Sequence, residues 1–299
     1  MRPGAPSRRD AMTESLQNPP RFVLSHLQAA ELLAERAAGK TLARTSLDLG
    51  RSYVVLALDE RGVHLSAGEL LEWSVVEHVA EADSVCFSID RGEAAPVRGF
   101  SEQLGRTYQL WPTAGPPALL VSGFVMHRVR DVDPVEGATR MVRALGTVRG
   151  RLLDTATGLG YAAIAAARTA AEVVTIELDP EVRAIARQNP WSRELFDTPN
   201  ITLRLGDSSR LIAALEADSF SAVLHDPPAI NLAGELYSAD FYAEVRRVLT
   251  RSGKFFHYIG DPASASGGRT TRGVVKRLRD VGFSRVVVRE DAFGVLATP

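Results

Sequence analysis

Hydrophobic and polar positions repeat with different periods in the two halves of the chain. In residues 22–38, apolar side chains recur at helical spacing and stop at Gly39, which predicts one helix. The next residues alternate apolar and polar positions in short runs separated by turn residues, which predicts antiparallel strands. The expected elements are a small sheet over 41–66, a helix over 67–82, a strand at 84–90 and two strands within 107–126. We therefore expect a smaller α+β region in this half.

After residue 148, apolar strands alternate with helical stretches. The expected strands are 151–154, 173–177, 201–205, 220–225 and 253–259, and the expected helices are 160–170, 180–189, 208–216, 239–249 and 270–281. This alternation predicts an α/β fold with a parallel, doubly wound sheet. Two more strands, 284–289 and 293–297, are joined by a short turn, so the last must run antiparallel to its neighbour.

Length and composition set limits on the class of protein. The chain has 299 residues, of which 45% are apolar and 24% charged, as in globular proteins. We expect a disordered tail over 1–20, an α+β substrate-recognition domain over 21–130 and a larger α/β domain over 131–299. Met12 is a second candidate for the translation start.

Charge and cysteine content exclude several function classes. Lys and Arg number 35 against 36 Asp and Glu, so the whole chain lacks the positive excess of proteins that bind nucleic acid by charge alone, although a local basic patch is compatible with it. The single cysteine, Cys86, excludes an internal disulfide and a zinc site made of several thiolates. No apolar run approaches the ~18 residues of a membrane span. We expect a cytoplasmic protein with no metal and no membrane partner.

A glycine turn between the first parallel strand and its helix is the strongest sign of a ligand site. Strand 151–154 is followed by Thr-Ala-Thr-Gly158-Leu-Gly160 and an alanine-rich helix, where backbone can approach a ligand closely. The second strand ends on Glu177, at the position where a carboxylate can bind both ribose hydroxyls. Together these features predict a nucleoside site, and Gly158 to Ala163 also fits the dinucleotide pattern G-x-G-x-x-A.

Two further acids favour a cationic nucleoside. Asp154 ends the strand before the glycine turn, where it would repel a pyrophosphate and attract the ammonium group of S-adenosylmethionine. Asp207 follows the third strand, where a carboxylate could bind the adenine amino group, or could simply cap the next helix.

These residues, in this order and with the fourth-strand motif His225-Asp226-Pro227-Pro228, resemble the motifs of class I S-adenosylmethionine-dependent methyltransferases. The resemblance covers roughly residues 135–299 and implies a Rossmann-like methyltransferase sheet of seven strands with the last antiparallel. It implies cofactor contacts at Asp154, Ala156, Gly158, Gly160, Tyr161, Glu177 and Asp207. Ala156 stands where that family more often has glycine, and a positive φ would strain it.

The segment from His225 to Tyr237 and the segment 255–262 more narrowly resemble a group of predicted archaeal-type methyltransferases with this HDPP motif. In methyltransferases that act on amino groups, a similar Asp/Asn-Pro-Pro-aromatic motif accepts hydrogen bonds from the target nitrogen. Here Ala229 replaces the aromatic residue that would stack on a flipped base.

Several residues near the same strand ends are candidates for catalysis. Asp226, with Pro227 and Pro228, is the leading one, and His225, Tyr237 and His257 could position a nucleophile or remove its proton. A loop over 263–268 is followed by Arg269, Arg272, Lys276, Arg277 and Arg279. That segment could be a lid with a basic helix that binds phosphate or RNA, or an ordinary solvated helix face.

The pattern leads to one main functional hypothesis. It is a methyltransferase that uses S-adenosylmethionine to methylate an amino nitrogen of an RNA base or a small metabolite. Three alternatives stay open: an aminopropyltransferase of the spermidine-synthase type, a dinucleotide-dependent oxidoreductase, and a non-enzymatic S-adenosylmethionine-binding module. The sequence identifies neither the acceptor nor the oligomeric state.

Overall fold

The chain divides into two units in the computed structural model, which describes residues 20–230 and 232–299. The first unit comprises the residues up to Pro134 together with Glu181–Arg193, and the second comprises Val135–Pro180 and Glu194–Pro299. The expected tail over 1–20 lies outside the described residues except for Pro20. Within the described ranges, none of the helices combines the length and the apolar character needed to cross a bilayer.

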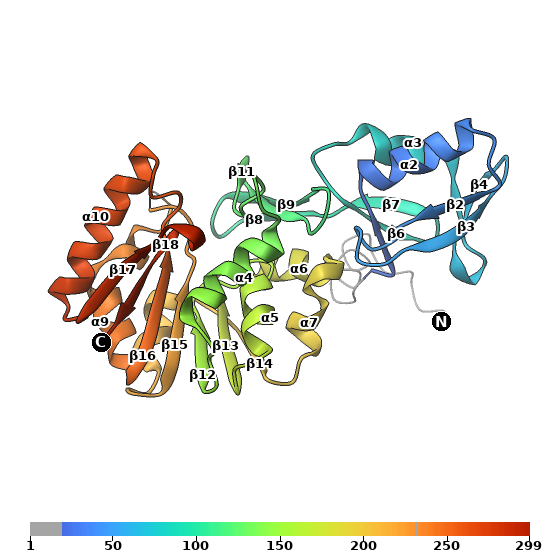
Figure 1. The fold of residues 1–299 in the computed structure, drawn as a ribbon. Coiled ribbons are helices and arrows are strands. Elements are labelled where there is room, and N and C mark those ends of the chain that lie inside the picture. The colour runs from blue at the N-terminus through green and yellow to red at the C-terminus, as the bar shows by residue number, and fades with distance from the viewer. Residues whose placement is uncertain (1–19, 231) are drawn as a thin grey trace. The chain divides into compact units, whose positions relative to one another are not determined.

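The first unit contains three small antiparallel sheets, the helices α2 (His26–Ala37) and α3 (Trp73–Glu81), and most of α6 (Pro180–Gln188) (Figure 1). Its sheets have the strand orders β1-β6-β7, β2-β3-β4-β5 and β11-β10-β9-β8. The elements are β1 (Phe22–Leu24), α2 (His26–Ala37), β2 (Leu42–Thr45), β3 (Val54–Leu58), β4 (Gly62–His64), β5 (Leu70–Glu72), α3 (Trp73–Glu81), β6 (Phe87–Asp90), β7 (Glu93–Pro96), β8 (Arg98–Ser101), β9 (Arg106–Trp111), β10 (Ala118–Val121) and β11 (Phe124–Val125).

The structure corrects two helix predictions in this unit. Residues 22–24 form a strand that pairs with β6, and α2 begins only after Ser25, whose side chain and that of Gln28 form a reciprocal capping box. Residues 70–72 likewise form β5 against β4, so α3 is shorter than expected. In both places the segment is a short strand, which periodicity over so few residues does not distinguish from a helix.

The second unit contains a seven-stranded sheet of order β14-β13-β12-β15-β16-β18-β17. The elements from residue 134 onward are α4 (Pro134–Leu145), β12 (Arg151–Asp154), α5 (Tyr161–Ala167), β13 (Glu172–Glu177), α6 (Pro180–Gln188), α7 (Arg193–Asp197), β14 (Ile201–Leu205), α8 (Ser208–Leu211), β15 (Phe220–His225), α9 (Ala239–Val248), β16 (Leu249–Tyr258), α10 (Ala265–Asp280), β17 (Arg285–Arg289) and β18 (Gly294–Thr298). Helix α6 is included here, although its residues from Glu181 on group with the first unit. All neighbours are parallel except β18, which is antiparallel to β16 and β17. The predicted α/β fold with an antiparallel last strand is thus confirmed.

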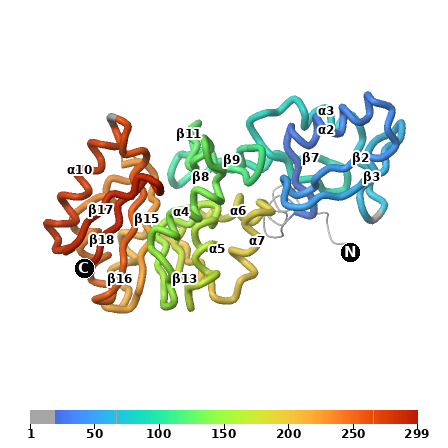
Figure 2. The backbone as a smooth tube through the Cα atoms, in the orientation of Figure 1, coloured from blue at the N-terminus to red at the C-terminus, as the bar shows by residue number. Residues whose placement is uncertain are grey.

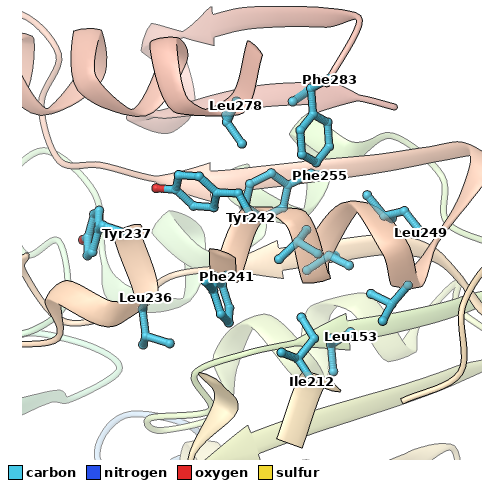
Figure 3. Packing of buried hydrophobic residues seen from close by; sticks show 14 of the residues in the cluster. Leu153, Ile212, Leu236, Tyr237, Phe241, Tyr242, Leu249, Phe255, Leu278 and Phe283 are labelled. Carbon is cyan, nitrogen blue, oxygen red and sulfur yellow. The ribbon is translucent and has the colours of Figure 1, made fainter. Parts of the chain in front are cut away.

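Strand β12 is third in this order, between β13 and β15, both of which are labelled in Figure 2; the chain continues on the β13 side before it crosses to the β15 side. The order reverses between β12 and β15, and open α/β sheets bind ligands outside the carboxyl ends of strands at such a point. The side of the sheet that α9 and α10 cover is filled by aromatic and aliphatic side chains, with Phe255 between Tyr242 and Phe283 (Figure 3). This core holds the strand ends in place.

Helix α10 begins earlier than the sequence suggested. Residues 265–268, expected in a loop, already belong to the helix, whose N-cap Ser264 accepts a hydrogen bond from the Gly267 N–H. A Cβ at Gly267 would lie 1.8 Å from the Asp261 carbonyl oxygen, so glycine is needed for close backbone packing and not for a flexible loop.

Candidate active site

The glycine turn is held between the two strands that flank β12. The Thr155 N–H donates to the Leu224 carbonyl, and the Thr157 N–H donates to the Ile176 carbonyl at 2.9 Å. Because both neighbours hold the turn, its backbone is fixed at the carboxyl edge of the sheet. Ala156 has a negative φ, so the strain considered for alanine at this position does not arise.

The two glycines of the turn serve different purposes. Both have positive φ, 54° at Gly158 and 80° at Gly160. A Cβ at Gly160 would lie 2.6 Å from the Leu195 side chain, whereas a Cβ at Gly158 would meet nothing within 4 Å. Gly160 therefore allows internal packing, and Gly158 leaves space in which a ligand can approach the backbone.

Asp154 is buried at the end of β12, and its carboxylate is the last acceptor in a chain of hydrogen bonds from two threonine hydroxyl groups. Thr157 donates to Thr175 at 2.6 Å, and Thr175 donates to one Asp154 carboxylate oxygen at 2.8 Å. Burial raises the pKa of Asp154 to about 7, even though the bond from Thr175 opposes the rise. A cation bound beside this carboxylate would favour its ionised form.

Glu177 joins the glycine turn to the next loop. One carboxylate oxygen accepts the Gly158 N–H at 2.9 Å and the other accepts the Asp179 N–H at 3.0 Å. Burial raises its pKa to about 7 against the effect of these bonds. Each oxygen keeps a second lone pair, so both remain able to accept a ribose hydroxyl.

Asp207 is the N-cap of α8. One of its oxygens accepts the Ser209 N–H at 2.8 Å, and the other lies 3.5 Å from the Arg210 guanidinium. The capping hydrogen bond is therefore the role that the structure gives the Asp207 side chain, and a contact with the adenine amino group stays a prediction.

Asp226 follows β15 and faces the same edge of the sheet as Asp154. Among the described residues, none donates a hydrogen bond to its carboxylate, and the residue keeps some contact with solvent. Burial, and secondarily the charge of Asp154, raise its pKa to about 7. An unpaired carboxylate this deep in a protein is costly unless a ligand pairs with it.

The two prolines after Asp226 differ in the use of their carbonyl groups. The Tyr237 hydroxyl donates to the Pro228 carbonyl at 3.1 Å, and burial raises the pKa of Tyr237, so the phenol stays neutral. No described residue donates to the Pro227 carbonyl. The turn therefore presents two acceptors without a partner, the Asp226 carboxylate and the Pro227 carbonyl. Ala229, at the position of the missing aromatic residue, is exposed.

His225 and His257, which the sequence made candidates for proton transfer, both have their ring nitrogens engaged within the protein. His225 is fully buried, donates from Nε2 to the Leu236 carbonyl at 2.9 Å and accepts at Nδ1 from Thr155. Burial lowers its pKa to about 3, so it is neutral and both ring nitrogens are engaged. His257 lies between Tyr242 and the His225 carbonyl, and its pKa is also lowered by burial. Neither ring has a free nitrogen to serve as a base.

Two residues at the site were missed by the sequence analysis. Thr175, the hydroxyl partner of Asp154, is a lone polar residue inside an otherwise apolar strand, and that contrast was the available signal. Leu178 is 43% exposed although it is aliphatic and directly follows Glu177. An exposed apolar side chain beside a nucleoside site is suited to contact a flat base. The predicted contact Tyr161 begins α5 with a buried side chain.

The arrangement fits S-adenosylmethionine better than a dinucleotide. Three carboxylates with raised pKa, at Asp154, Glu177 and Asp226, lie at the ends of the adjacent strands β12, β13 and β15, where the glycine turn leaves open space at Gly158. The ammonium and sulfonium groups of S-adenosylmethionine would stabilise ionised carboxylates, whereas a pyrophosphate would be repelled. Within the described part of the chain, no three His, Cys, Asp or Glu residues are grouped so as to hold a metal ion.

Comparison with known proteins agrees with this assignment of the fold. Residues 153–257 match the family model described as a methyltransferase domain. An uncharacterized protein of Methanocaldococcus jannaschii is 44% identical over 192 residues, which cover 64% of this chain and 66% of that protein, slightly under two thirds of its length.

Solved structures show the same fold. A spermidine synthase in complex with the transition-state analogue AdoDATO superposes with a TM-score of 0.58 at 15% identity, over 67% of this chain and 72% of that chain. The spermidine synthase of Thermotoga maritima gives a TM-score of 0.53 at 13% identity, over 67% and 71% of the two chains.

The fold and the family match agree on the class: residues 153–257 match a methyltransferase domain, and the seven-stranded sheet with its antiparallel strand β18 is that of a Rossmann-like methyltransferase fold. More particularly, the chain is similar over 192 residues to the M. jannaschii protein.

Proposed function

We propose that the chain is a methyltransferase that transfers the methyl group of S-adenosylmethionine to an amino nitrogen of an RNA base or a small metabolite. The observation that supports this most is the pair of unpartnered acceptors, the Asp226 carboxylate and the Pro227 carbonyl, beside the glycine turn. An amino group has two N–H donors and can satisfy both acceptors at once.

The proposed roles follow from these contacts. S-adenosylmethionine, when bound, supplies a methyl group on a positively charged sulfur. Asp154 and Glu177 would hold its ammonium and ribose groups, while Asp226 and the Pro227 carbonyl orient the acceptor nitrogen. Asp226, with a pKa of about 7, is also suited to accept the proton that the nitrogen loses.

Aminopropyl transfer is the second candidate function. The specific observation in its favour is the fold shared with spermidine synthases, at TM-scores of 0.58 and 0.53. It would use the same acid-lined site with decarboxylated S-adenosylmethionine as donor. The two functions are separated by supplying each donor alone and identifying the group transferred.

The experiment that tests the proposal measures cofactor binding and methyl transfer separately. Radiolabelled S-adenosylmethionine is incubated with the full chain and an extract lacking this protein, then fractionated into RNA, protein and small molecules. Asp226→Ala should keep cofactor affinity and lose transfer, while Glu216→Ala, which removes an exposed carboxylate of the same unit, should keep both. Full transfer by the Asp226 variant with unchanged affinity would refute the proposed role.

A further inference from the structure

Helix α10 has a charge distribution unlike that of the whole chain. Residues 239–299 contain eleven basic and six acidic residues, although the chain as a whole has a net charge of −1. Within α10, five basic residues stand against the single acid Asp280. The net charge of the whole chain is therefore close to zero although helix α10 is locally positive.

Four of these basic residues lie along one side of the helix. Arg269, Arg272, Lys276 and Arg279 are exposed and are spaced three, four and three residues apart. At about 100° per residue they fall within an arc of about 80°. Val274 and Leu278, both fully buried, define the opposite side, which packs toward the core.

Most of the charges in this row, hereafter the basic row of α10, have no ion-pair partner among the residues that the structure describes. Lys276 pairs with Asp280 at 2.6 Å, but no described residue forms an ion pair with the three arginines. Unpaired guanidinium groups in a row are suited to bind phosphates, which they contact in a bidentate manner.

The basic row also starts near the candidate active site. Strand β16 is parallel to β15, with His257 opposite His225, so its end at Tyr258 lies at the edge where Asp226 begins its turn. The chain then needs only residues 259–264 to reach the start of α10, which lies beside β17 and β18 (Figure 1). The row therefore begins toward the carboxyl edge of the sheet, the edge at which Asp226 also lies.

We infer that the basic row of α10 binds the phosphate backbone of RNA and that the acceptor class of the proposed methyltransferase is RNA. Only the second statement, that RNA is the methyl acceptor, rests on the proposed function. From Arg269 to Arg279 the helix rises about 15 Å, the axial length of about four phosphates of a stacked strand. A membrane surface fits less well, because surface-bound helices need an exposed apolar face and the apolar face of α10 is buried.

The test replaces the three unpaired arginines in the full chain. Arg269→Gln, Arg272→Gln and Arg279→Gln are combined, which keeps good helix formers and leaves the Lys276–Asp280 pair intact. The probe is fluorescein-labelled single-stranded RNA of mixed sequence, and fluorescence anisotropy gives Kd over a series of salt concentrations.

The control variant removes three positive charges, as the α10 variant does, from another surface of the same unit. Arg149, Arg168 and Arg251 are also exposed and lie toward the amino ends of the strands, away from Asp226. Their combined replacement by Gln should change Kd by less than about twofold. The α10 variant should bind about tenfold more weakly or worse, and its salt slope should fall by about 2, since each phosphate contact on a single strand contributes about 0.7.

Three results would overturn the inference: no RNA binding by the unchanged chain at low salt, equal weakening in both variants, or binding through α10 to anionic phospholipid vesicles but not to RNA. Methyl transfer measured in parallel separates the two proposals. RNA binding through α10 without methylated RNA would contradict the proposed function alone. Methyl transfer to a small metabolite by an α10 variant with unchanged activity would contradict RNA as the acceptor.

Discussion

Replacing Asp226 by asparagine should make the ligand-free protein more stable, by an amount that grows from about pH 4 to about pH 7 and stays constant above that. Burial raises the pKa of this carboxyl from 3.8 to about 7, so the folded protein binds its proton more tightly than the unfolded chain does. Below about pH 4 the carboxyl group is neutral in the folded and the unfolded state, and it costs no stability. Between about pH 4 and about pH 7 the free-energy cost of the buried carboxylate grows, and above about pH 7 it is complete. The neutral amide avoids that penalty.

The size of the effect follows from the pKa. At about 1.4 kcal/mol for each pH unit, a rise from 3.8 to about 7 corresponds to at most about 4 kcal/mol. Because Asp226 keeps some solvent contact and shares the effect with Asp154, we expect about 2 kcal/mol at about pH 8. No described residue donates to the carboxylate, so the substitution breaks no hydrogen bond within the protein.

Thermal denaturation at several pH values measures this directly. The difference in melting temperature between Asp226→Asn and the unchanged chain should be near zero at about pH 4 and reach about 4 °C or more at about pH 8. Glu216→Gln, at an exposed carboxylate, should show no such trend. A difference independent of pH, or a variant less stable at about pH 8, would refute the reasoning.

Other substitutions separate structural from ligand-facing roles. Gly160→Ala should destabilise the unit by about 2 kcal/mol or more, because its φ is 80° and its Cβ would meet Leu195 at 2.6 Å, as thermal denaturation would show. Gly158→Ala, with open space around its Cβ, should destabilise less and should chiefly weaken S-adenosylmethionine binding in calorimetry. Tyr237→Phe removes the bond to the Pro228 carbonyl and should cost about 1 kcal/mol, with a lower kcat but unchanged cofactor affinity; an unchanged kcat would contradict a positioning role.

Features that depend on local sequence were predictable. The glycine turn follows from Gly158 and Gly160 after an apolar strand, and the capping role of Asp207 follows from its place before α8. The antiparallel β18 follows from the short connection after β17. Each of these involves residues close together in the chain.

The role of His225 was not predictable, because its partners are distant in sequence. Its ring bonds to Thr155 and Leu236, which are 70 and 11 residues away, and only the folded chain shows that both nitrogens are engaged. The residues that neighbour a histidine in the sequence do not show whether its ring nitrogens are engaged within the protein or free to contact a substrate. The strand at 22–24 was mistaken for helix for a related reason, since its partner β6 lies more than 60 residues further on.

Transfer of radiolabelled methyl from S-adenosylmethionine into fractionated extract is the most direct test of methylation of RNA through Asp226. We expect label in the RNA fraction, lost in Asp226→Ala and kept in Glu216→Ala, with cofactor affinity unchanged in both. Binding of S-adenosylmethionine without label in any fraction, or label that persists in the Asp226 variant, would contradict it.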